Sequence, residues 1–205
     1  MYVGGAMEMN NSKFYIDNTD KYPDDKRDDA VGGIYFGTST KLTGKEEVIL
    51  NNCEVGSLLT CDLPALRCLV SQRNYEVNGV PYDDISSVQI NNCKLYGGKE
   101  TVFGFQSGLA LTDKKSAPNT TKFNVNKGTE IYVRDTSSET GYRLYSQAEL
   151  ASDIQTAKRT IVRQDDKRDV VDTIRTGAIA FTQYTDLEGK QVGLWTDECN
   201  VYDNR

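Results

Sequence analysis

Apolar and polar residues alternate along much of this chain, as expected for β-strands that bury one face. Apolar side chains recur at every second position in Ile34 and Phe36, and again in Val48 and Leu50. This period of two predicts strands, and the segments are rich in Val, Ile, Tyr, Phe and Thr, which suit pleated sheets. Strands are predicted near residues 34–38, 47–55, 66–71, 87–96, 101–111, 121–126, 129–134, 178–184 and 191–195.

Parts of this pattern are repeated within the chain. The pentapeptide at 24–28 recurs at 165–169, and related residues follow each copy, so the 34–55 unit is predicted to be duplicated near the C-terminus. A second repeat has an offset of 40 residues. It matches Val48 to Val55 with Val88 to Leu95, and both segments contain Asn-Asn-Cys. Residues 123–133 form a weaker third copy. Such repeats predict a fold built from similar units.

We interpret each unit as a β-hairpin. A glycine in the polar segment between strands supplies the positive φ that a tight turn needs, and Asn78-Gly79 is the strongest short hairpin signal. Because a lone hairpin is marginally stable, the units must pack together. Cys53, Cys93 and Cys199 would then share one equivalent buried position. The predicted class is mainly β, with antiparallel hairpin repeats packed as a sandwich or barrel-like sheet pair.

A small helical insert is predicted near 147–175. It starts with a capping box, in which Ser146 and Glu149 each satisfy a backbone amide of the first turn. Four apolar residues then lie on one face of the helix. They are Leu150, Ile154, Ala157 and Ile161. A second short helix is predicted over 170–177, ending at Gly177.

These elements divide the chain into four predicted parts. The parts are an extended N-terminal arm at 1–30, a β-rich domain at 31–145, the helical insert at 146–177, and a C-terminal hairpin at 178–205 that repeats the 34–55 unit. The first part is predicted to be an arm because polar and acidic residues flank its one short apolar run, Phe14-Tyr15-Ile16.

Composition limits the possible partners. The chain has 205 residues, 38% of them hydrophobic, and a net charge of −6, which is a globular composition. No basic stripe is present to neutralise phosphates, so neither nucleic acid nor an anionic membrane is predicted as a partner. The N-terminal residues lack the basic and apolar regions of a signal peptide. The compartment stays open, with a virion or the cytoplasm favoured over Sec-dependent secretion.

The chain has no histidine, which excludes Ser-His-Asp and Cys-His catalysis and histidine-ligated metals. Carboxylate, lysine and tyrosine chemistry remain open. The five cysteines form no Cys-x-x-Cys pair and are predicted to be reduced, buried thiols. They are Cys53, Cys61, Cys68, Cys93 and Cys199. No catalytic residue, cofactor site or metal site is predicted.

One acidic turn leads into the predicted strand at Val88. The segment Tyr82-Asp83-Asp84-Ile85-Ser86-Ser87 resembles one half of the calcium clamp of microbial βγ-crystallins. Asp83 matches that pattern, Tyr82 departs from it, and no second half is present. The resemblance implies a calcium site that includes Asp83 and Ser86, whereas a turn closed by bonds to the local backbone is the alternative. The acidic clusters at 24–29 and 165–169 lack the EF-hand layout and are predicted to be solvated loops or a subunit interface.

Three functions follow from these observations. The leading prediction is a non-enzymatic structural, assembly or adhesion protein that acts in an oligomer, with a composition similar to that of viral and phage particle proteins. Its partners would be copies of itself or other assembly subunits. The alternative is a small-ligand or calcium-binding β-module. The third is a carboxylate-dependent hydrolase, since its two acids need no local motif.

Overall fold

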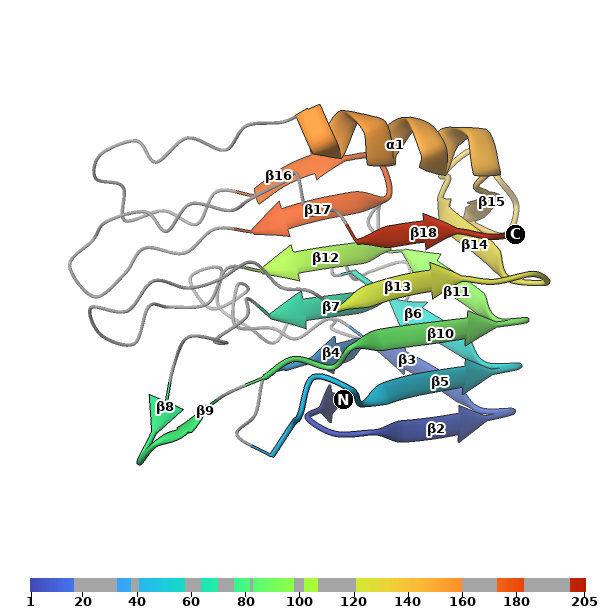
Figure 1. Ribbon diagram of the computed structural model, residues 1–205. Coiled ribbons are helices and arrows are strands. Elements are labelled where there is room, and N and C mark those ends of the chain that lie inside the picture. Colours follow the sequence, from blue (N-terminus) through green and yellow to red (C-terminus); the bar gives the residue numbers. More distant parts are fainter. Residues whose placement is uncertain are drawn as a thin grey trace, which may run out of the picture.

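The structure is a computed structural model. It describes residues 1–16, 33–37, 41–57, 64–69, 76–81, 83–97, 102–106, 121–159, 173–182 and 200–205. These residues form three large sheets, a two-stranded hairpin and a helix. We call the sheets A, B and C (Figure 1).

The chain winds through sheets A, B and C in turn, and each of the first four circuits, or coils, adds a strand to each sheet. Coil 1 holds β1 (Tyr2–Val3), β2 (Met7–Asn10) and β3 (Lys13–Ile16), and coil 2 holds β4 (Ile34–Phe36), β5 (Glu47–Asn51) and β6 (Glu54–Ser57). Coil 3 holds β7 (Leu66–Leu69), β10 (Ser87–Asn91) and β11 (Lys94–Gly97), and coil 4 holds β12 (Phe103–Gln106), β13 (Lys122–Val125) and β14 (Glu130–Arg134). Coil 5 adds β17 (Ile179–Thr182) to sheet A and β18 (Val201–Asp203) to sheet B. This architecture is a parallel β-helix.

Strands of successive coils pair in parallel in all three sheets. The mainly β class is confirmed, but the predicted antiparallel hairpin repeats in a sandwich or barrel-like sheet pair are wrong. A repeated segment pairs with its own copy in the next coil, and the segment that follows it along the chain enters a different sheet. Alternation of apolar residues does not distinguish the two arrangements, because both bury every second side chain.

The 40-residue repeat is therefore present in the structure, but it relates successive coils and not two hairpins. Val48 is the register partner of Val88, and Val88 is in turn the partner of Phe123. The predicted repeat of the 34–55 unit at the C-terminus does not hold at its end, because Val201 pairs with Phe123 in sheet B whereas Val55 lies in sheet C. Ile34 and Ile179, by contrast, do occupy one buried column of sheet A.

Three antiparallel pairs occur among the described residues. The Asn78-Gly79 turn joins β8 (Glu76–Val77) to β9 (Val80–Pro81), with φ of 53° and 78° at the two turn residues, so this hairpin is confirmed. Strand β15 (Tyr142–Leu144) turns back on β14, and β16 (Thr173–Thr176) turns back on β17. The second helix predicted over 170–177 is wrong at 173–176, which form β16.

The core lies inside the coils, where alternate side chains of all three sheets meet. Three phenylalanines of sheet A approach the ring of Phe123 in sheet B, with centroids 5.5 to 5.8 Å apart. They are Phe36, Phe103 and Phe105. Burial of such large apolar rings is the main favourable contribution to folding.

Asparagines form two ladders at the corner between sheets B and C. In the first ladder, each side-chain amide donates to the amide oxygen one coil earlier, with N–O distances of 2.9, 2.9, 2.8 and 3.2 Å. Its members are Asn10, Asn51, Asn91, Asn126 and Asn204. In the second ladder, Asn11, Asn52 and Asn92 have φ of 50°, 54° and 51°, a left-handed conformation that asparagine tolerates better than most residues.

Two cysteines follow these asparagines and stack inside the corner. Cys53 and Cys93 are buried free thiols, and the Cys53 amide donates to the Cys93 sulfur at 3.4 Å. Thr129 continues this column, because its hydroxyl accepts the Cys93 amide at 3.3 Å. The prediction of reduced, buried thiols is confirmed for Cys53, Cys93 and Cys68. Cys61 and Cys199 lie outside the described residues.

Helix α1 (Gln147–Arg159) covers the C-terminal end of the coils, over β16, β17 and β18 (Figure 1). Its buried face includes Leu150 and Ala157, with Ile154 partly buried. The capping box is confirmed, since Ser146 Oγ accepts the Glu149 amide at 3.2 Å and the Glu149 carboxylate accepts the Ser146 amide at 2.8 Å.

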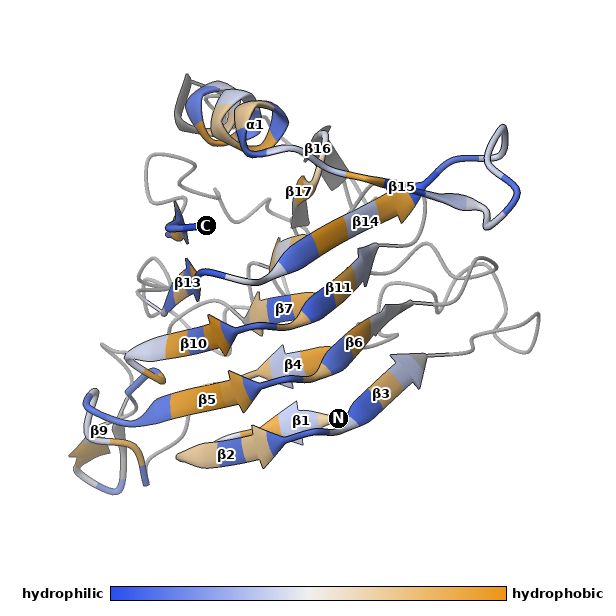
Figure 2. Ribbon diagram, turned by 90° about the vertical axis from the view of Figure 1, so that its right-hand side faces the viewer, coloured by the Kyte–Doolittle hydropathy of each residue, from blue (hydrophilic) through white to orange (hydrophobic). Residues whose placement is uncertain are grey.

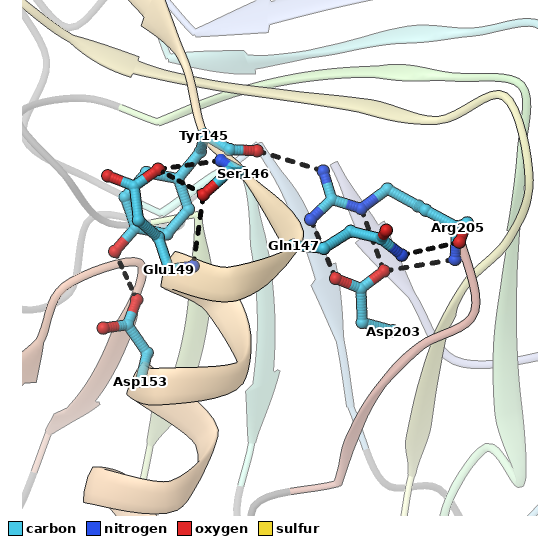
Figure 3. Close-up of polar contacts among 7 residues, drawn as sticks. All are labelled: Tyr145, Ser146, Gln147, Glu149, Asp153, Asp203 and Arg205. Atoms are coloured by element: carbon cyan, nitrogen blue, oxygen red, sulfur yellow. Dashed lines mark hydrogen bonds and ion pairs between the residues drawn. The ribbon is translucent and has the colours of Figure 1, made fainter.

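The end of the chain is fastened to this helix. The Arg205 side chain forms an ion pair with Asp203 at 2.8 Å and donates to the Tyr145 carbonyl at 3.1 Å, and Gln147 donates to the Arg205 carbonyl at 2.6 Å (Figure 3). Tyr145 in turn donates to Asp153 at 2.6 Å. The first 16 residues, expected to form an arm, supply one strand to each sheet.

Candidate functional site

Sheet C presents two ordered columns of side chains on its outer face. Its strands β3, β6, β11 and β14 run beside one another in coil order, on the side of the molecule next to sheet B (Figure 2). Register places Lys13, Glu54, Lys94 and Glu130 side by side, which we call the charge column. Register also aligns Tyr15, Gly56, Tyr96 and Tyr132, which we call the tyrosine column.

The charge column alternates in sign from coil to coil. Lys13 Nζ lies 2.9 Å from a Glu54 oxygen, and Lys94 Nζ lies 3.8 Å from a Glu130 oxygen. The hydrogen bond from Tyr15, followed by that from Lys13, holds the pKa of the Glu54 carboxyl below its ordinary value. With two lysines and two glutamates, the column has a formal net charge of zero.

The two columns are joined by hydrogen bonds. The Tyr15 hydroxyl donates to Glu54, and the Tyr132 hydroxyl donates to Glu130 at 2.8 Å. Burial and the bonded Glu130 carboxylate raise the pKa of Tyr132 to about 12. Burial and the bonded Glu54 carboxylate likewise raise the pKa of Tyr15. Both phenols consequently stay protonated as donors, and their rings are held in place from the polar end.

The tyrosine rings contact one another across the face. Tyr96 stacks on Tyr132 with centroids 5.0 Å apart and an interplanar angle of 12°, and Tyr142 meets Tyr96 edge-on at 5.1 Å. Tyr15 lies 6.2 Å from Tyr96. Tyr15 is 40% exposed, and Leu144, the register partner of Tyr132, is 57% exposed. The face thus offers apolar area bordered by paired charges, a composition typical of binding surfaces.

Gly56 is buried within the tyrosine column, against the next coil. A Cβ atom at this position would lie 2.3 Å from the Tyr96 carbonyl oxygen and 2.5 Å from Tyr96 Cβ. No side chain fits there without displacing the next coil.

The predicted calcium turn lies just before β10. Asp83 Oδ1 accepts the Asp84 amide at 2.9 Å, and its carboxylate lies close to Gly44. The Ser86 amide donates to the Glu46 carbonyl at 2.8 Å. The Asp83 contact matches the local-turn alternative, whereas the Ser86 amide bonds to the backbone of the neighbouring coil. Within the described ranges, no group of three or more acidic, cysteine or histidine side chains is placed to hold a metal ion.

Tyr82 and the acidic clusters at 24–29 and 165–169 lie outside the described residues.

A buried polar group was not anticipated from the sequence. Asp84 and Thr121 are almost fully buried near the Cys68 thiol, whose pKa is raised well above its ordinary value by burial and then by the Asp84 charge. Arg67 is only 4% exposed although both its neighbours in β7 point into the core. Alternation alone assigns Arg67 to the outer face of the sheet and gives no sign that it is covered.

The chain matches no protein-family model, no curated protein and no solved structure. In the part of the chain that the structure describes, no helix is long and apolar enough to cross a membrane.

Proposed function

We propose that this chain is a non-enzymatic structural protein that acts in an oligomer, as an assembly or adhesion component. The observation that carries the proposal is the outer face of sheet C, where partly exposed tyrosines are fixed by hydrogen bonds beside paired charges. A surface whose side chains are already immobile loses little conformational entropy when a partner binds.

The β-helix supports such a role through its rigidity. The first asparagine ladder passes through every coil, and the core is continuous from Val3 in coil 1 to Val201 in coil 5. Each coil is held by its neighbours, so a force or contact at one face is shared along the stack. A stiff scaffold with a fixed contact face would suit a part of a viral or phage particle. The absence of histidine from the sequence is in keeping with this role.

Light scattering coupled to size-exclusion chromatography tests the proposal directly. We expect a mass above the 22.9 kDa of the single chain, rising with loading concentration. A monomer at every concentration up to the millimolar range, with no binding to co-purified particle subunits, would contradict it.

A further inference from the structure

We propose that the outer face of sheet C binds a second copy of this chain in a twofold dimer whose coils run in opposite order. The inference rests on the proposed function and adds the surface, the symmetry and the residue pairs. It is carried by the order of the charges and by the tyrosine rings that lie beside them.

The charge column is self-complementary when its order is reversed. From coil 1 to coil 4 its signs are plus, minus, plus and minus, at Lys13, Glu54, Lys94 and Glu130. A twofold axis along the strands, between coils 2 and 3, sets Lys13 opposite Glu130 of the second copy. The same rotation sets Glu54 opposite Lys94 of the second copy. By symmetry each pair occurs twice, so every charge faces its opposite.

The other possible axis fails this requirement. A twofold axis parallel to the long axis of the β-helix and passing over the charge column keeps the coil order, so Lys13 would face Lys13 of the second copy and each remaining charge would also face itself. Like charges in contact across an interface are strongly unfavourable. Of these two arrangements, only the one with reversed coil order sets every charge of the column opposite its opposite.

The tyrosine column adds apolar area in the same arrangement. Gly56 is buried within its own chain, so the rings of the column supply this contact. Tyr15, the most exposed ring of the column, faces Tyr132 of the second copy. Tyrosine rings fixed in this way supply contact area at low entropic cost.

Sheet B offers a weaker surface of this kind. One of its outer columns reads Glu8, Ile49, Gln89, Asn124 and Tyr202, and reversing its order pairs neither its one charge nor its one ring with a complementary group. A second outer column, Glu47, Ser87 and Lys122, holds two opposite charges, whereas the charge column of sheet C holds four and lies beside the tyrosine rings.

The size of the face sets the strength of the dimer. At about 4.8 Å between strands and about 3.4 Å per residue, the strands of sheet C cover roughly 300 Å² in projection. A stable complex buries about 800 Å² per partner. The dimer is accordingly concentration-dependent, and because its specificity is electrostatic, salt weakens it.

Sedimentation velocity at low salt, over micromolar to millimolar protein, measures this association. Lys94→Glu sets like charges opposite each other twice, at Glu54, and Glu54→Lys does the same at Lys94. We expect each variant alone to dimerise about tenfold more weakly than the wild type. Lys122→Glu, an exposed lysine on sheet B, is the matched control and leaves dimerisation unchanged.

Mixing the two variants is the decisive step. One Lys94→Glu chain opposite one Glu54→Lys chain restores every opposite-charge pair, so the mixture is expected to dimerise at least as well as the wild type. Circular dichroism and thermal melting show that each variant is folded. A mixture no stronger than its components overturns the inference. Oligomers insensitive to both substitutions overturn it while leaving the proposed function standing, whereas a monomeric wild type contradicts both.

Discussion

Gly56 shows how one position can be fixed by a residue distant in sequence. The alternation in 54–57 marks a strand but does not show that position 56 must lack a side chain. That requirement comes from Tyr96 in the next coil, whose backbone occupies the space a Cβ would need. The sequence alone shows the glycine but not that Tyr96 lies beside it.

Replacement of Gly56 should therefore destabilise the fold. We expect Gly56→Ala to lower the free energy of unfolding by about 1–3 kcal/mol, because the added methyl group forces the two coils apart. Gly5→Ala is the control, since a Cβ there meets nothing within 4 Å and should change stability by less than about 0.5 kcal/mol. Urea unfolding of both variants measures the difference, and equal effects would contradict the argument.

At the scale of elements, the capping box and the tight turn were predicted correctly, whereas the helix predicted over 170–177 and the direction of strand pairing were not. The capping box at Ser146 and the Asn78-Gly79 turn were predicted correctly because each depends on contacts within a few residues. Strand direction depends on which distant segment supplies the partner. The tyrosine and charge columns likewise exist only through the register between coils, so no pattern within one segment could have revealed them.

The asparagine ladder should contribute measurably to stability. Asn91→Ala removes the bond to Asn51 at 2.9 Å and the bond from Asn126 at 2.8 Å, and we expect a loss of about 1–3 kcal/mol. Asn124→Ala on the same sheet, outside both ladders, should cost much less. Thermal and urea unfolding compare the two, and similar losses would show that the ladder adds nothing specific.

The ion pair at the C-terminus should make stability depend on pH. Burial alone would raise the pKa of Asp203, but the hydrogen bonds and charge of Arg205 outweigh it, so this pKa lies below its ordinary value. A carboxyl with a lowered folded-state pKa stabilises the protein above its unfolded pKa of about 3.9, and the contribution is lost as the pH falls through the folded value.

Asp203→Asn tests this dependence. We expect a lower melting temperature than wild type at pH 7 and a smaller decrease between pH 7 and pH 3. Lowered pKa values at Glu149 and Glu54 leave part of the dependence in place. An unchanged pH profile in the variant would contradict a role for the Asp203 carboxylate.

At the scale of the whole molecule, the repeat length was the signal that distinguished the two folds. A hairpin pairs 34–36 with 47–51, whereas an in-register coil pairs Val48 with Val88, so that Asn-Asn-Cys lies beside Asn-Asn-Cys. Periods of 20 to 50 residues are typical of stacked architectures. The sequence contained this information, but strand alternation alone led to the antiparallel interpretation.

Removal of one coil follows as a test of the repeat. Deleting 52–91 joins Asn51 to Asn92 and takes one strand from each sheet, because Asn51 and Asn91 are register partners. We expect a folded β protein with a lower melting temperature. It would have fewer contacts between neighbouring coils, but the remaining contacts would be of the same type. Deleting 52–71 is the control and should abolish cooperative unfolding, as followed by circular dichroism. Equal behaviour of the two deletions would contradict the coil as the unit of stability.

The connections between sheets differ in how much sequence they hold. Two residues join β5 to β6 and two join β10 to β11, whereas the path from β7 to β10 includes the hairpin of β8 and β9. The two-residue connections fix the spacing between successive coils. The longer connection from β7 to β10 does not affect that spacing. A foreign peptide spliced into the tip at Asn78-Gly79, where a Cβ on Gly79 would meet nothing within 4 Å, would therefore be displayed to solvent while the scaffold beneath kept its shape.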